Sequence, residues 1–261
     1  MSLDLDGYFA RILWSGPKSA DLSTLTGLLA AHMRAIPFEN LDPLLGRRVL
    51  LDLGSLQDKL VRRRRGGYCF EHATLFQAVL AELGFTVTSH LARVVLAAPK
   101  TESSRTHMFN LVHLPEGKFV ADPGFGGPAA TVPLRLAAPP AAPAGHWFGR
   151  DEAGDWVLRG GPGDLWVTEL ATDYPIDFEL PNHYVATHPD SIFTTNLMLN
   201  RFTEDGRVSL MNRDATLRKG GEVKSWRIAD RGTLRDLLRE AFGIDLPEAE
   251  TLRVPAVAEW T

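Results

Sequence analysis

The spacing of apolar residues changes near Gly84, and this change constrains the fold more than any other feature of the sequence. Before it, apolar residues recur at helical intervals, as at Leu75, Val79 and Leu83, and Gly84 stands where a helix would end. After it, short β-prone runs such as HMFNLVHL are separated by Pro, Gly, Asp and Asn. The first third is therefore predicted to be a helical unit, and the middle third a compact antiparallel sheet or barrel.

Helix and strand signals mix in the last third. The pattern predicts a helix through Phe193 and Leu197, a strand pair from about Arg207 to Arg218, and an amphipathic helix in TLRDLLREAFGI. The Ala/Pro-rich stretch LAAPPAAPAGHW has β-type segments on both sides, so we place it in a loop of the second unit. A chain of 261 residues is near the size at which one core divides. We therefore expect an α+β protein with units at residues 1–85, 86–190 and 191–261.

The charge balance excludes several classes of partner. With a formal net charge of −4 and a pI near 6.1, the chain has no global positive field to draw it to nucleic acid or to an anionic membrane. It has no run of about 18 apolar residues and no secretory signal pattern at its N-terminus, so we expect a soluble, cytoplasmic protein. Its histidines show no metal-ligand spacing, so we expect no metal site. The sequence does not indicate an oligomeric state.

The single cysteine, Cys69, excludes internal disulfides and sites built on several thiolates. It stands at the expected start of a helix, where exposed amides and the positive end of the helix dipole favour the nucleophilic thiolate. The preceding Gly66 and Gly67 let the backbone amides around residues 68–70 approach a reacting carbonyl and its developing oxyanion. Arg65, next to these glycines, is expected to anchor the loop. The alternative is a buried cysteine that acts as a small hydrophobe.

A cysteine nucleophile needs a base, and the base needs an orienting group. Among eight histidines, His107 opens the predicted strand HMFNLVHL, and the next predicted strand, KFVAD, ends at Asp122. If the hairpin turns at the 114–115 bond, these two residues face each other; if it turns at residues 116 and 117, they are offset by four residues and need a bulge or a longer loop. Each also has an ordinary alternative, as a structural strand histidine and a turn-forming aspartate.

These segments resemble the active-site segments of the arylamine N-acetyltransferase family. RGGYCFEH around Cys69, THMFNLV around His107 and DPGFGG from Asp122 follow the family's three segments in order. IPFENLD, from Ile36, resembles its N-terminal signature, and THPDSIFTTNLM, near residues 187–198, resembles the segment that leads into its third domain. The resemblance covers most of the chain and is weaker after about residue 160.

The resemblance implies a three-domain cysteine-transferase fold: an N-terminal helical bundle, a central antiparallel β-barrel and a C-terminal α/β lid. It implies that Cys69 accepts the acyl group, that His107 acts as general base and acid, and that Asp122 orients the imidazole. The implied reaction is ping-pong. Acetyl-CoA, a co-substrate rather than a bound cofactor, acetylates the cysteine, and an arylamine, arylhydrazine or N-hydroxyarylamine accepts the acetyl group. The residues matched to substrate and CoA binding are Phe38, Tyr68, Phe70, Phe125 and Gly126.

Two residues depart from the family pattern. Ala73 stands where many relatives have Asn, and Pro123 follows Asp122 where a small or branched apolar residue is usual. Pro123 removes a backbone donor and restricts the conformation of Asp122, so we expect a local adjustment with retained activity.

Three other functions stay open from the sequence. A macrolactam-forming amide synthase of the same fold would use the same triad, and a cysteine protease or thioesterase would use water in place of the amine. A non-enzymatic binding module would simply bury Cys69. The sequence indicates neither the preferred amine nor the choice among acetyl-, propionyl- and malonyl-CoA.

Overall fold

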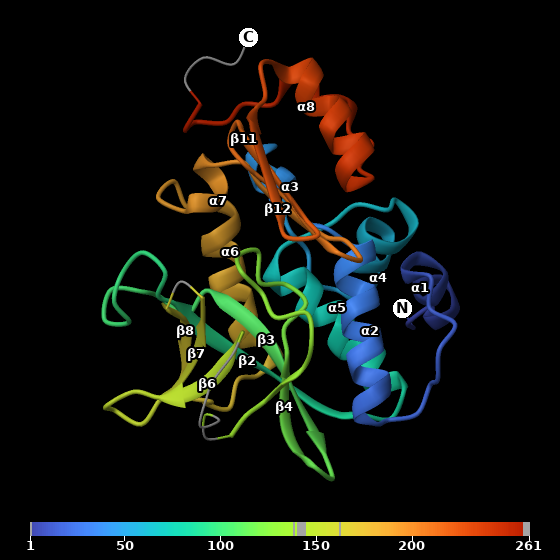
Figure 1. Cartoon of the computed structure of the whole chain (residues 1–261), viewed down its shortest axis with the longest axis vertical. Helices are drawn as coiled ribbons and strands as arrows, with labels where there is room; N and C mark the ends of the chain where they lie inside the picture. The colour runs from blue at the N-terminus through green and yellow to red at the C-terminus, as the bar shows by residue number, and fades with distance from the viewer. Residues whose placement is uncertain (1, 138, 140–144, 162, 258–261) are drawn as a thin grey trace.

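The computed structural model of the protein describes residues 2–137, 139, 145–161 and 163–257 (Figure 1). The helices of the first third lie beside a curved sheet from the middle third, and a second sheet with α8 (Arg231–Leu237) lies beyond them. The fold is α+β, with a helical bundle, a barrel and an α/β lid, as predicted. The unit boundaries at residues 85 and 190 stay predictions. Half of the predicted loop LAAPPAAPAGHW, residues 138 and 140–144, lies outside the described residues.

Aspartate side chains start three helices of the first third. Asp4, Asp21 and Asp52 each accept a hydrogen bond from a backbone N–H of the first turn, at 2.8, 2.8 and 3.0 Å. The last helix of the bundle is followed by Gly84, whose φ of +84° is left-handed, as its predicted stop position requires. The elements are α1 (Leu5–Ile12), α2 (Leu22–Ala35), β1 (Phe38–Glu39), α3 (Leu41–Leu44), α4 (Leu53–Leu56), the π-helix η1 (Gln57–Arg62) and α5 (Cys69–Glu82).

The described residues of the middle third form an antiparallel sheet of seven strands that curls into a nearly closed barrel (Figure 1). The strand order is β5-β4-β3-β2-β8-β7-β6. Helix α5 packs against β2 and β3, and the first six residues of β3 are all buried, which explains the nearly continuous apolar sequence of that strand. The strands are β2 (Thr86–Val94), β3 (His107–Leu114), β4 (Gly117–Ala121), β5 (Leu134–Arg135), β6 (Trp147–Arg150), β7 (Trp156–Gly160) and β8 (Gly163–Thr168).

The hairpin of β3 and β4 turns at Pro115 and Glu116, between the two positions considered from the sequence. Pro115 has no N–H and cannot extend the ladder, so the strand ends before it. If this register is continued one step beyond the last residue pair, Asp122 lies opposite Phe109. Both registers expected from the sequence are therefore wrong. His107 is displaced from Asp122 by two positions. A shift of two keeps both side chains on one face of the sheet, where diagonal neighbours remain within reach.

The second sheet unites the last third with a strand from the first third. Its order is β1-β9-β10-β11-β12, and Phe38 of β1 pairs with Asn200 of β9. The predicted strand pair is confirmed as β10 and β11, and the predicted amphipathic helix as α8, which continues into the π-helix η3. The elements are β9 (Met198–Phe202), β10 (Gly206–Met211), β11 (Asp214–Lys219), β12 (Glu222–Arg227), η3 (Leu238–Phe242) and η4 (Pro247–Thr251).

The helix predicted through Phe193 and Leu197 is shorter than expected, since α7 (Ile192–Thr195) ends before Asn196. The side-chain amide of Asn40 donates to the carbonyls of Phe193 and Asn196 at 2.8 and 2.6 Å, which turns the chain out of the helix. Leu197 is buried in the core of the lid. Two preceding helices were not predicted: η2 (Pro175–Phe178) and α6 (Glu179–Thr187). Within the described ranges, no helix is both long and apolar enough to cross a membrane.

Candidate active site

Cys69 is the first residue of α5, as predicted, and only 4 % of its surface is exposed. The two glycines before it let the loop pass close to the chain at β1. A Cβ on Gly66 would lie 2.0 Å from the carbonyl oxygen of Pro37, so only glycine fits there without a shift of the backbone. A parallel bridge joins Gly67 to Phe38. The loop before the nucleophile is therefore tied to β1.

The backbone around Cys69 supplies hydrogen-bond donors. The N–H of Tyr68 is already used, because it donates to Oε2 of Glu71 at 3.1 Å. The N–H groups of Cys69 and Phe70 lie in the first turn of α5, where a helix supplies no acceptor of its own and its dipole adds partial positive charge. Both amides therefore lie at the nucleophile and have no acceptor within the helix itself.

His107 opens β3 and Asp122 follows β4, and their side chains meet. Nε2 of His107 lies 2.7 Å from Oδ2 of Asp122, and Oδ1 of the same carboxylate accepts from the N–H of Gly124 at 3.3 Å. Pro123 has no N–H, but the N–H of the next residue, Gly124, donates to the Asp122 carboxylate. The proline therefore does not keep His107 and Asp122 apart. Both side chains are buried.

The surroundings of His107 favour the charged imidazole. Burial alone lowers its pKa, but the Asp122 carboxylate and the hydrogen bonds to Asp122 and Cys69 outweigh burial and raise the pKa to about 10. Because Nε2 faces Asp122, Nδ1 is the ring nitrogen left for Cys69. Sγ of Cys69 also lies 3.7 Å from the carbonyl oxygen of Thr106. The three predicted residues are therefore together, as a nucleophile, its base and an orienting carboxylate need to be.

Aromatic rings enclose His107. Phe125 meets its ring edge-on with centroids 5.2 Å apart, and Trp166 of β8 lies 5.9 Å away. Trp166 is fully buried and stacks on Phe109 at 4.7 Å. The sequence singled out Phe125 but not Trp166, because a tryptophan in a strand carries no local signal of which distant residue it will contact. This apolar wall keeps water from the His107 ring and so strengthens its interactions with nearby charges.

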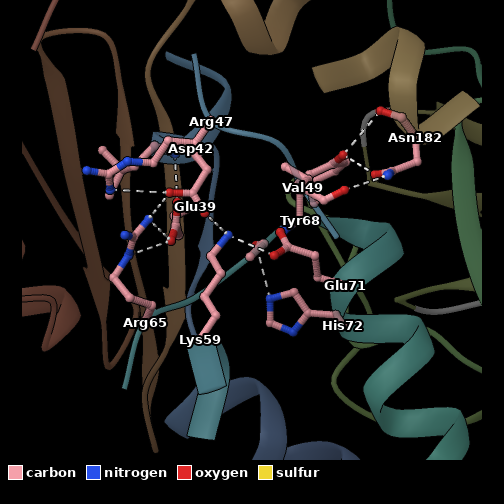
Figure 2. A network of polar contacts seen from close by, with 12 residues as sticks. Glu39, Asp42, Arg47, Val49, Lys59, Arg65, Tyr68, Glu71, His72 and Asn182 are labelled. Carbon is pink, nitrogen blue, oxygen red and sulfur yellow. Dashed lines mark hydrogen bonds and ion pairs between the residues drawn. The ribbon is translucent and has the colours of Figure 1, made fainter. Parts of the chain in front are cut away.

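The predicted binding residues fall into two groups. Phe38 and Gly126 lie together, because a Cβ on Gly126 would be 2.5 Å from atoms of the Phe38 ring. Tyr68 and Phe70 are instead fully buried, and the Tyr68 hydroxyl donates to the side-chain oxygen of Asn182 on α6 (Figure 2). Their side chains offer no exposed surface to a ligand in this structure.

Buried ion pairs also hold the loop that precedes Cys69 (Figure 2). Nη2 of Arg65 lies 2.7 Å from Oε1 of Glu39, and Nζ of Lys59 lies 2.6 Å from Asp42 and 2.7 Å from Glu71. Arg65 also contacts Asp42 at 3.2 Å, which connects the two groups. The expectation that Arg65 anchors the loop is confirmed. The acidic partners were not predicted, because they come from β1, the following helix and α5.

Two cavities lie near the site. One of about 630 Å³ reaches Thr106 and is also lined by Arg105, Leu180 and Tyr184. A larger one of about 740 Å³ lies between α5, β2 and α6, and its lining within the described residues does not include Cys69 or the His107 pair. The described lining of the smaller cavity does not include these three residues either, and its link to the cysteine is Thr106, whose carbonyl oxygen lies 3.7 Å from Sγ of Cys69. Among the side chains that the structure describes, no group of three His, Cys, Asp or Glu residues is placed to hold a metal ion.

Known proteins resemble this chain over nearly its whole length. The sequence model of the N-acetyltransferase family matches residues 21–251. The arylamine N-acetyltransferase of Mycobacterium bovis is 42 % identical over 259 residues, which cover 95 % of this chain and 92 % of the relative. The arylamine N-acetyltransferase / N-hydroxyarylamine O-acetyltransferase of Salmonella typhimurium is 35 % identical, with 96 % and 92 % covered. The structure of Mycobacterium marinum arylamine N-acetyltransferase in complex with CoA is similar, with a TM-score of 0.86 and 37 % identity over 94 % of each chain.

Proposed function

Because the chain belongs to the arylamine N-acetyltransferase family, we propose that Cys69, His107 and Asp122 form a triad that transfers an acetyl group from acetyl-CoA to an arylamine. The chain is an acyltransferase. One observation carries the assignment of the triad: the 2.7 Å contact of His107 with Asp122, which lies beside a cysteine at the start of α5.

The first half of the proposed reaction loads the cysteine. The resting pair is a Cys69 thiolate beside a charged His107 ring, which agrees with the raised pKa of that ring. The thiolate attacks the carbonyl carbon of acetyl-CoA, and the oxyanion that forms is met by the N–H groups of Cys69 and Phe70. The C–S bond to CoA then breaks, the CoA sulfur takes the proton from His107, and an acetyl thioester remains on Cys69.

The second half discharges the thioester. The amine nitrogen attacks the acetyl carbon, and His107, now neutral, takes the proton that the nitrogen loses. The bond to Cys69 breaks and the thiolate returns, so the site again holds a thiolate and a charged ring. An arylamine suits this step because its low basicity leaves it largely unprotonated at neutral pH. Asp122 stays ionised and keeps the ring oriented through both halves.

The acceptor class follows from the relatives and from the aromatic surroundings. We assign arylamines, arylhydrazines and N-hydroxyarylamines, since a Salmonella typhimurium relative is named for both N- and O-acetylation. We assign Phe38 and Phe125 to the ring of the acceptor, since Phe125 packs edge-on against His107 and Phe38 lies against Gly126. The space beside Gly126 is filled by the Phe38 ring, so a role of Gly126 toward the pantetheine arm requires that ring to move. CoA as the donor's carrier is supported by the related structure that contains it.

The first test mixes the purified protein with acetyl-CoA without any amine and records intact mass and released thiol. Wild type is expected to gain one acetyl group, which a Cys69→Ser variant does not gain as a thioester. Addition of an arylamine or hydrazine should then discharge the adduct. No adduct at any pH from about 6 to 9, a range that brackets ordinary Cys and His titration, would rule out acetyl-CoA as the donor and favour a macrolactam-forming amide synthase.

A further inference from the structure

Beneath the nucleophile loop lies a row of buried side chains that the proposed transfer does not use. Tyr8 of α1, His32 of α2 and His72 of α5 are all fully buried. The Tyr8 hydroxyl lies 2.8 Å from Nδ1 of His32, and Nε2 of His32 lies 2.8 Å from Nδ1 of His72. Nε2 of His72 in turn lies 3.1 Å from the carbonyl oxygen of Gly67 and 3.2 Å from that of Pro37. Figure 2 shows His72 next to Glu71 at the start of α5.

The acceptors at one end of this row determine the place of every proton in it. Carbonyl oxygens only accept, so Nε2 of His72 must carry a proton. In a neutral ring Nδ1 then accepts, so Nε2 of His32 donates to it. Nδ1 of His32 is left to accept from the Tyr8 hydroxyl. The hydrogen bonds therefore run in one direction, from Tyr8 to the carbonyls of Pro37 and Gly67.

Both imidazoles are held in the neutral form that this arrangement needs. Burial lowers the pKa of His72 to about 4 despite its two carbonyl partners and the charge of Glu39, and the Lys59 cation adds to the lowering. Burial, His72 and Arg11 hold the pKa of His32 well below its usual range. A proton added to Nδ1 of His72 would also point at the N–H of His32, so the geometry itself opposes the charged form.

The two carbonyls belong to the backbone that shapes the reaction site. Pro37 precedes Phe38, whose ring packs against Gly126. Gly67 belongs to the loop just before Cys69, and its N–H donates to the Pro37 carbonyl at 3.2 Å. The His72 proton, shared between both carbonyls, thus holds the Phe38 segment and the nucleophile loop to the first turn of α5.

We propose that Tyr8, His32 and His72 are positioning residues for the acyl transfer, because their hydrogen bonds hold Phe38 and the loop before Cys69 against the start of α5. The kinetic consequence rests on the proposed function, whereas the arrangement of protons does not. A set of side chains that only filled the core would tolerate any residue of similar size at position 72. A positioning set needs a donor where Nε2 of His72 lies.

The arrangement of protons is tested by NMR on protein labelled with ¹⁵N-histidine, using long-range proton–nitrogen spectra between about pH 5.5 and 8, which spans the ordinary His pKa. Wild type is expected to show His32 and His72 neutral with the proton on Nε2 throughout. Tyr8→Phe removes the hydroxyl that donates to Nδ1 of His32, but the carbonyls at the other end still fix the protons, so both rings should keep the Nε2 proton and only the Nδ1 shift of His32 should change. A charged ring or a proton on Nδ1 in wild type would overturn the proposal, and so would a second His32 tautomer or an unchanged Nδ1 shift of His32 in Tyr8→Phe.

The kinetic test compares His72→Gln with His72→Leu in the rate of CoA release during the first turnover. The Gln amide reaches as far as Nε2 of histidine and keeps a donor, so its rate should stay within about threefold of wild type, while Leu should lose about tenfold, the scale of one or two hydrogen bonds. Equal rates for two folded variants would overturn the proposal. If His72→Leu does not fold, Tyr8→Phe takes its place, and its rate of CoA release should be about threefold lower than that of wild type. An unchanged rate in Tyr8→Phe would then overturn the proposal. Wild type that forms no acetyl-cysteine would refute the proposed function alone, because the spectra still decide the arrangement of protons.

Discussion

Replacement of Asp122 by asparagine removes the charge that faces His107 and keeps the shape of the side chain. Although burial lowers the pKa of His107, Asp122 and Cys69 together raise it from 6.5 to about 10. This difference corresponds to about 5 kcal/mol in favour of the charged ring. The Asp122 carboxylate is the largest favourable cause, so it supplies the main part of this difference. Asp122→Asn should therefore lower the pKa of His107 by about two units or more.

The same pKa gives a pH dependence of stability with a definite sign. The pKa of His107 is raised in the folded state, so its stabilising contribution is fully present below about pH 6.5 and is lost as the pH rises through about 10. The difference in Tm between wild type and Asp122→Asn should therefore be largest near pH 6 and become small near pH 10. Thermal unfolding at several pH values measures it.

The reactive pair is assayed by alkylation of Cys69 with iodoacetamide between about pH 5 and 10, a range that covers both states of His107. His107 stays charged up to about pH 10 and its charge favours a thiolate beside it, so the wild-type rate should not fall between about pH 6 and 9. In Asp122→Asn the rate at pH 7 should fall by about tenfold or more and then climb with pH. Asp164→Asn, at an exposed ion pair with Arg159, is the matched control and should follow wild type. An Asp122→Asn profile that coincides with wild type would refute the reasoning.

Two further substitutions test the loop that precedes the nucleophile. Arg65→Met leaves buried carboxylates without their cation, so it should lower the free energy of unfolding, measured in urea, by about 3–5 kcal/mol. The control Arg62→Met, at the surface, should change this free energy by less than about 0.5 kcal/mol. Losses of equal size in the two variants would contradict a role for burial. Gly66→Ala places a carbon 2.0 Å from the Pro37 carbonyl oxygen and should lower Tm by about 5 °C or more, while Gly161→Ala, which has open space around it, should not. Equal Tm values for the two alanine variants would show that the close approach is not there.

The sequence by itself determined the features that depend on neighbouring residues. Helical spacing that ends at Gly84 placed Cys69 at the start of α5, and the glycines before it indicated a close backbone approach. The chemical types needed for an acyl transfer, at His107 and Asp122, were also visible in order along the chain. The error in the hairpin register did not change the prediction that His107 and Asp122 lie close together. The alternation of side chains in a strand kept both residues on one face.

Only the tertiary structure decided which distant residues meet at the site. Trp166 reaches His107, and the Tyr68 hydroxyl turns to Asn182 instead of to a ligand. The row from Tyr8 to His72 exists because three helices pack together, and none of its members carries a local signal. The physical reason is that hydrophobic burial is not directional. Apolar spacing specifies which face of an element is buried, but the residue that lies opposite is set by how the elements pack, and the buried polar groups must then find hydrogen-bond partners there.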